Sequence, residues 1–165
     1  MSRIYQGLEG YGDYVAKIIV RPASENVKKL TEVKHKVDGN FSAVRDDVSE
    51  FFRTGTAEYE VCVQLCTDLE KMPVEDLAVQ WSESESPFRP VARIVIKPQD
   101  SYSPARRVYG DDVLSFSPAH ALAAHRPLGS IMRTRLKVYG QASAFRHQIN
   151  AINKVEPRSI DELPA

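Results

Sequence analysis

The chain has 165 residues, of which 42% are hydrophobic and 27% are charged, a composition that suits one globular domain with its own core. Its 22 basic and 22 acidic residues give a formal net charge of zero, so no positive field predicts binding to nucleic acid or to an anionic membrane. No apolar run approaches the roughly 18 residues that a membrane-spanning helix needs, and the first residues contain no apolar signal-peptide core.

The two cysteines, Cys62 and Cys66, fall inside one expected strand. Four residues of extended chain separate them by about 13 Å, which is too far for a disulfide bond. We therefore expect two free thiols, which are typical of a reducing compartment, and a cytoplasmic location for the protein.

The first half of the chain alternates between expected strands and helices. Alternating apolar positions predict a strand over residues 13–21. Helices are predicted over residues 24–35, with Ser24 as the N-cap, and over residues 42–52. The clearest strand pattern follows over residues 56–67.

The second half has one more strand, long connections and a helix of unusual length. The strand is predicted over residues 91–96 and a short helix over about 105–114. Pro127 suits the first position of a helix, and apolar residues then recur at spacings of three and four. This pattern predicts an amphipathic helix over residues 127–153 with one face buried.

These elements predict an α+β fold: antiparallel strands with wrapping loops, followed by a long C-terminal helix. The expected strands are too few to close a barrel, so we expect part of a sheet with open edges that need partners. Residues 1–155 are predicted to form one domain and residues 156–165 a polar tail.

Three polar side chains share one face of the last helix. At 100° per residue, Tyr139 lies about 40° and Arg146 about 20° from Arg135. Burying a guanidinium without a partner costs several kcal/mol, so acids from elsewhere or a ligand should meet these arginines if the face is buried. The alternative is a surface stripe whose side chains extend to water.

An ordered series of segments resembles haem catalases, over about residues 12–153. The stretch from Phe116, F-S-P-A, leads to the pentapeptide from Arg135 to Tyr139, R-L-K-V-Y. Upstream, the segment from Trp81 contains P-F-R-P-V-A-R-I. The sequences Q-L-C-T-D from Gln64, W-S-E-S-E-S-P and H-R-P-L-G are similar to those of a divergent branch of small bacterial catalase-related proteins.

The resemblance implies a haem b cofactor and assigns roles to four residues. Tyr139 matches the proximal iron ligand, bound as tyrosinate, and Arg135 matches the arginine that hydrogen-bonds its oxygen, so these two are the catalytic candidates. A phenol ionises near pH 10 in water, so a neighbouring cation favours the phenolate. Arg146 matches the arginine that pairs with a haem propionate, and Phe116 is expected at the cofactor. Ser143 departs from the pattern, because catalases often have histidine there.

The peroxide side of a catalase pocket has no counterpart in the sequence. In that family a histidine and an asparagine from the N-terminal half cleave peroxide. None of the chain's four histidines lies in a matching strand; they are His35, His120, His125 and His147. The chain therefore resembles the C-terminal half of the fold, as a split or truncated gene would encode.

The resemblance implies decomposition of peroxide, as in a catalase or peroxidase, by a chain that is incomplete without an N-terminal half. The expected partners are haem, a peroxide substrate, and either further copies of the chain or a complementing N-terminal half. The alternative is a non-catalytic haem-binding or structural remnant of a catalase-like protein.

Overall fold

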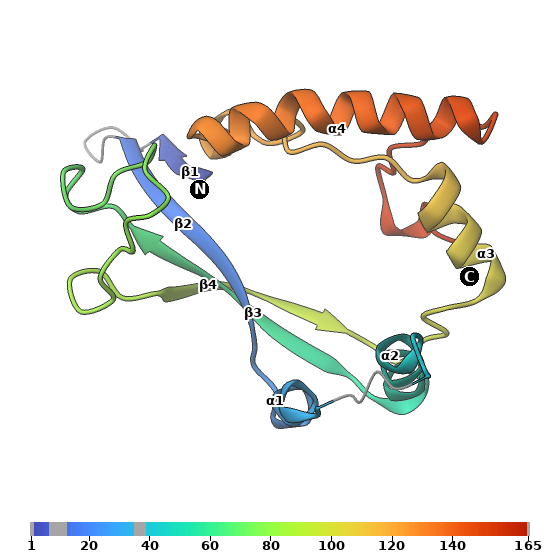
Figure 1. Ribbon diagram of the computed structural model, residues 1–165. Coiled ribbons are helices and arrows are strands. Elements are labelled where there is room, and N and C mark those ends of the chain that lie inside the picture. The colour runs from blue at the N-terminus through green and yellow to red at the C-terminus, as the bar shows by residue number, and fades with distance from the viewer. Residues whose placement is uncertain (1, 7–12, 35–38, 165) are drawn as a thin grey trace.

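The computed structural model describes residues 2–6, 13–34 and 39–164 of the chain (Figure 1). Four strands form one sheet: β1 (Ser2–Gln6), β2 (Asp13–Pro22), β3 (Ala57–Leu65) and β4 (Arg89–Ile96). The α-helices are α1 (Glu25–Glu32), α2 (Ala43–Thr54), α3 (Pro104–Val108) and α4 (Ser130–Ile149). Shorter turns are the π-helical η1 (Tyr109–Val113) and the 3-10 helices η2 (Ala123–His125) and η3 (Ile160–Glu162). Among the described residues, no helix combines the length and apolarity needed to cross a membrane.

The sheet is antiparallel, with its strands in chain order β1-β2-β3-β4. Ile18 pairs with Val63 and Tyr59 with Ile94, so the predicted strands 13–21, 56–67 and 91–96 are confirmed within a few residues. The strand β1 was not predicted. The α+β class is confirmed, whereas the described strands form an open sheet in which β1 and β4 are edges, and no closed barrel is seen among them.

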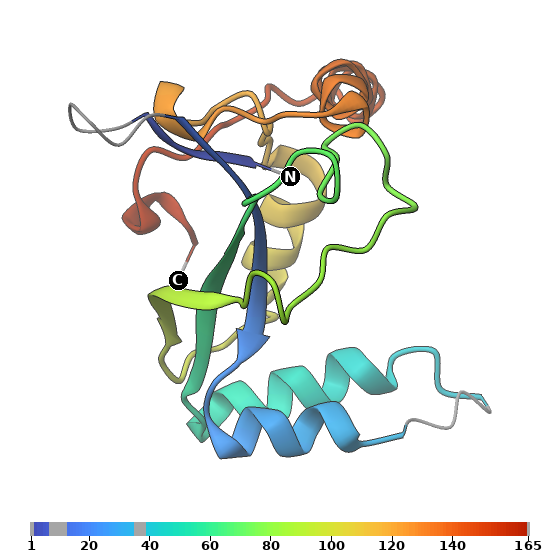
Figure 2. The ribbon, with the colours of Figure 1, turned by 90° about the vertical axis from the view of Figure 1, so that its left-hand side faces the viewer.

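The two ends of the sheet carry different helices. Figure 2 shows α1 and α2 side by side at one end, and α4 lies across the other end. Helices α1 and α2 were both predicted, and their N-caps are Ser24 and Ser42. The Ser24 side chain accepts no bond from its own helix; its hydroxyl oxygen instead accepts one from the Glu58 amide at 3.3 Å, which ties the start of α1 to β3.

The best-buried side chains lie where the loop of residues 66–88 covers β3. They are Trp81, Met72, Gln64 and Cys62. Gln64 donates to the carbonyl oxygens of Trp81, Ser82 and Ser86, and the Ser86 hydroxyl donates to the Leu65 carbonyl. The row of β3 that contains Cys62 and Gln64 is therefore covered, although its sequence is the more polar of the two.

Both cysteines are free thiols, as predicted. Cys62 is buried within β3, and Cys66 lies just beyond the end of the strand, half-buried. Burial raises the pKa of the Cys66 thiol, so this group is less reactive than an exposed cysteine.

Helix α4 is shorter and more exposed than its sequence predicts. It begins at Ser130 rather than at Pro127, because Gly129 at its N-cap has a φ of 91°. It ends at Ile149. The apolar residues of the predicted buried face are exposed, Val138 to 50% and Phe145 to 66%. Of the helix's 20 residues only His147 is buried. The expectation of a buried face was therefore wrong for the chain alone, because η1 and residues 114–116 cover only part of that face.

Candidate functional site

Tyr139 and Arg135 interact directly on α4. They lie one turn apart, the spacing at which helical side chains meet. The Arg135 guanidinium donates a hydrogen bond from Nη2 to the Tyr139 hydroxyl oxygen at 2.6 Å, and its carbon lies 5.0 Å from the centre of the phenol ring. Tyr139 is half-buried and Arg135 is exposed. The structure thus brings together the two residues that the sequence pairs.

Phe116 reaches the same place from a different part of the chain. Its ring meets the Tyr139 ring edge to face, with the ring centres 5.7 Å apart and the planes at 70°. This geometry matches the quadrupoles of two aromatic rings. Phe116 follows the strand-like segment after η1 and is 66% exposed, so the contact with Tyr139 leaves most of its ring free.

A hollow of about 390 Å³ lies beside this aromatic pair. Its wall combines one segment after η1 with one side of α4 and is mostly apolar. The lining residues are Leu114, Ser115, Phe116, Val138, Tyr139, Ala142, Ser143 and Arg146. All four residues predicted for the site therefore lie in or beside one hollow, three of them lining it and Arg135 bonded to Tyr139.

Arg146 binds the backbone of its own chain. Its Nη1 donates to the carbonyl oxygens of Gly110, at 3.4 Å, and Asp111, and its Nη2 donates to the Leu114 carbonyl. The sequence did not predict these acceptors, because they lie more than 30 residues away along the chain. Its role as a partner of a haem propionate stays a prediction.

His147 is the one buried histidine in the described part of the chain. Its Nδ1 lies 2.6 Å from the Ser143 carbonyl oxygen and its Nε2 lies 2.9 Å from that of Val113. The Ser143 hydroxyl bonds the Ser115 hydroxyl at 2.8 Å, so the position where catalases often have histidine joins α4 to the wall of the hollow. Sequence reasoning missed His147; its spacing of four residues from Ser143 was the available signal.

The other histidines lie away from the hollow or outside the described residues. His120 pairs with Glu156 at 3.0 Å and is more than half exposed. His125 ends the short turn η2 and is exposed. His35 lies outside the described residues. None of the described histidines lines the hollow beside Tyr139.

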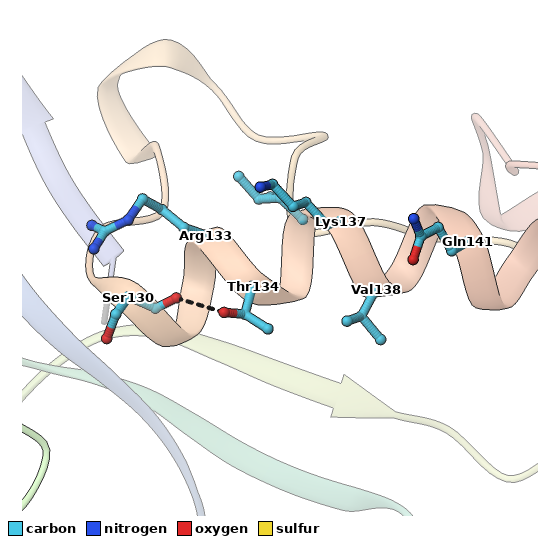
Figure 3. A pocket seen from close by; sticks show the side chains of 7 residues that line it. Ser130, Arg133, Thr134, Lys137, Val138 and Gln141 are labelled. Atoms are coloured by element: carbon cyan, nitrogen blue, oxygen red, sulfur yellow. Dashed lines mark hydrogen bonds between the residues drawn. The ribbon is translucent and has the colours of Figure 1, made fainter.

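A second and larger hollow, of about 730 Å³, lies along α4 and shares Val138 with the first. Figure 3 shows its lining, which includes Arg133, Thr134 and Lys137 and no residue predicted for the site. Arg133 is engaged by Glu75 in a two-pronged ion pair of 2.8 and 2.9 Å, whose hydrogen bonds lower the pKa of the Glu75 carboxyl and raise the pKa of Arg133. This hollow brings no acid-base pair or nucleophile together, so its size does not make it the chemical site.

The donor set at Tyr139 decides what could be held there. No group of three or more His, Cys, Asp or Glu side chains that could hold a metal occurs among the described residues. A single phenol oxygen suits a metal whose other ligands come with it, as the four nitrogens of a haem do. The Arg135 bond and the apolar wall fit that group, whereas the guanidinium of Arg146 is already occupied by carbonyl oxygens.

Comparisons with known proteins support the fold. No known protein family matches the sequence, and no curated protein resembles it significantly in sequence. Four chains of solved structures match the structure. One is the crystal structure of a fungal catalase, with a TM-score of 0.62 and 18% sequence identity over 88% of this chain. The chain therefore has a catalase-like fold, and it spans 29% of the length of that fungal chain.

Proposed function

We propose that the chain is a catalase-like haem-binding protein in which Tyr139 is the proximal iron ligand. The observation that carries the proposal is the 2.6 Å bond from Arg135 to the phenol oxygen, beside an apolar hollow. A guanidinium in this position stabilises negative charge on the oxygen, which is what a tyrosinate ligand requires. The edge-to-face contact with Phe116 helps to orient the phenol ring.

Bound haem would supply the redox chemistry by which peroxide is decomposed. The chain's own part would be to hold and orient that group: Tyr139 as the ligand, Arg135 as the hydrogen-bond donor to the ligand oxygen, and Phe116 and Ala142 as apolar walls. The segments around Gln64 and Trp81 favour a place in the divergent branch of small bacterial catalase-related proteins. The two free thiols favour a cytoplasmic location.

We assign turnover of peroxide to an assembly rather than to the chain alone. None of the described histidines lines the hollow, so the proposal places the group that handles the protons of peroxide outside the described residues. The partner in that assembly is either an N-terminal half of a catalase-like fold or a further copy of this chain. The same observation supports the second candidate, a haem-binding protein without catalytic activity.

The test is a titration with ferric haem followed by absorption, for the wild-type chain and for Tyr139→Phe. We expect saturable binding at one site with a tyrosinate-type visible spectrum in the wild type, and loss of that spectrum in the variant. Tyr102→Phe is the matched control, because Tyr102 is an exposed tyrosine away from the hollow. Equal, non-saturating spectra from all three proteins would overturn the proposal. Peroxide consumption by the loaded wild type in the presence of an N-terminal half of a catalase-like fold would separate the catalytic candidate from the non-catalytic one.

A further inference from the structure

The carbonyl end of the helical stretch formed by α3 and η1 faces the last turns of α4. A helix leaves its final carbonyl groups without partners inside the helix, and cations are favourable there. Four of these carbonyl oxygens accept bonds from α4: those of Gly110, Asp111 and Leu114 from Arg146, and that of Val113 from His147. Two consecutive side chains of α4 thus cap a helix that lies more than 30 residues upstream.

Each of the two side chains bonds more than one carbonyl oxygen in this arrangement. The Nε2 of His147 lies 2.9 Å from the Val113 carbonyl oxygen and its Nδ1 lies 2.6 Å from the Ser143 carbonyl oxygen, so the ring bridges η1 and α4. The guanidinium of Arg146 spreads two nitrogens over three acceptors, a span that a lysine ammonium cannot reproduce. His147 is only 7% exposed, so water does not replace these bonds.

A second set of bonds fixes the same segment from its other side. The backbone amide of Ser115 donates to the Val155 carbonyl at 2.8 Å, and the Val155 amide donates to the Val113 carbonyl at 3.0 Å. Asn150 donates to the Asp112 carboxylate at 2.9 Å. Residues 110–115 are therefore held on the end of α4 before the chain reaches Phe116.

Phe116 depends on this attachment for its place. Its ring is mostly exposed, and the ring that it meets is that of Tyr139. Leu114 and Ser115, which precede it, form part of the same wall of the hollow. Moving residues 110–115 off α4 would therefore remove one wall of the hollow and the aromatic neighbour of Tyr139.

We propose that Arg146 and His147 are positioning residues that clamp residues 110–115 to α4 and so build the hollow beside Tyr139, with Arg146 acting on the backbone and not on the carboxylates of a ligand. The identity of the hollow's occupant rests on the proposed function, but the clamp itself does not. If Arg146 instead paired with a ligand carboxylate, replacing Arg146 would change the protein only when the ligand is bound. Residues 110–115 would then stay on α4 in the ligand-free variant.

The test is hydrogen exchange followed by mass spectrometry on the chain without haem. For Arg146→Gln and for His147→Gln we expect the amides of residues 109–116 to exchange about tenfold faster or more, while the strands β2 and β3 keep their protection. Lys137→Gln is the matched control, since Lys137 is an exposed cation of the same helix that lines the other hollow. Unchanged exchange over residues 109–116 in both clamp variants would overturn the proposal.

Arg146→Lys separates charge from geometry. A carboxylate contact depends chiefly on charge, so lysine would keep much of it, whereas the clamp needs two nitrogens held in one plane. We expect Arg146→Lys to leave residues 109–116 nearly as unprotected as Arg146→Gln does. Full protection in the lysine variant, together with weaker haem binding in Arg146→Gln, would assign Arg146 to the ligand instead. All exchange is measured without haem, so the exchange of residues 109–116 can be interpreted even if the chain does not bind haem.

Discussion

Gln64 is a buried polar side chain of β3 that bonds the covering loop at three carbonyl oxygens. It is 1% exposed, and its amide nitrogen lies within 3.5 Å of three carbonyl oxygens of the loop, those of Trp81, Ser82 and Ser86. These carbonyl groups have lost their contact with water, so they need the donor. Gln64 therefore helps to fix the conformation of the loop on β3.

We predict that Gln64→Leu lowers the free energy of unfolding by about 1–3 kcal/mol, because an apolar side chain of similar size leaves buried acceptors without a donor. Urea unfolding followed by circular dichroism measures the change. Gln80→Leu is the matched control, since Gln80 belongs to the same loop but is exposed, and it should change stability by less than about 0.5 kcal/mol. Equal effects of the two substitutions would contradict the role given to Gln64.

At the residue scale, the sequence predicted contacts within one helix and missed contacts between elements. Arg135 and Tyr139 were paired correctly, because helical geometry fixes neighbours four residues apart. The acceptors of Arg146 and His147 belong to residues 110–114, and their approach depends on how the chain returns after η1. The periodicity of the sequence does not show that residues 110–114 pack against α4.

Among the elements, α4 is positioned at its first turn. Gly129 has a φ of 91°, a conformation that side chains with a Cβ rarely adopt, and a Cβ there would lie 3.0 Å from the Val74 carbonyl oxygen. The pair of Arg133 with Glu75 attaches the same turn to the loop of residues 66–88. The direction of α4, and with it the place of Tyr139, is set by these contacts.

Gly129→Ala should therefore destabilise the protein by about 1–3 kcal/mol, since it combines backbone strain with a close approach to a carbonyl group. Gly140→Ala provides the opposite case in the same helix: nothing lies within 4 Å of a Cβ at that position, so the substitution should stabilise by up to about 1 kcal/mol. Thermal unfolding of the two variants measures both effects. A stabilising Gly129→Ala would show that α4 can begin in another conformation.

The elements were predictable where pattern and burial agree. Alternation identified β2 and β3, and flanking prolines identified β4. Ser24 as the N-cap identified α1, and an apolar stripe identified α2. The pattern of α4 also identified a helix, but its apolar stripe is exposed, because a sequence shows which face is apolar and not whether anything covers it. The start of α4 was placed too early, since Pro127 suits a first turn and the φ of Gly129 is not visible in the sequence.

The whole molecule exposes far more surface than a closed domain of its mass. Its accessible surface is 11910 Å², whereas a compact protein of 18.5 kDa has about 8,200 Å². Part of the excess is the apolar stripe of α4, and part is the edge strand β4, where Val91, Ile94 and Val95 are 59%, 41% and 51% exposed. An edge of this kind offers unpaired backbone groups beside apolar side chains, which favours addition of another strand.

We predict that the purified chain associates with itself when no other partner is present. Light scattering after size-exclusion chromatography should show species larger than a monomer, and Val95→Lys should reduce them several-fold by placing a charge on the edge strand. Leu77→Lys is the matched control, because it replaces an exposed apolar residue of similar accessibility, 58%, in the loop away from β4. A monodisperse monomer at micromolar concentration would show that the open surfaces of the wild-type chain are tolerated in water.

Trp81 gives this molecule an optical property that follows from its position. It is the one tryptophan of the sequence, it is 2% exposed, and its indole N–H donates to the Pro73 carbonyl at 3.3 Å. The ammonium of Lys17 lies 4.4 Å from the centre of the ring, and burial lowers the pKa of that lysine. The tryptophan fluorescence of the protein therefore comes from a single residue that reports whether the loop is closed over β2 and β3. A ligand at Tyr139 that quenches this emission would do so by energy transfer. A red shift without quenching would mean that the loop itself has opened.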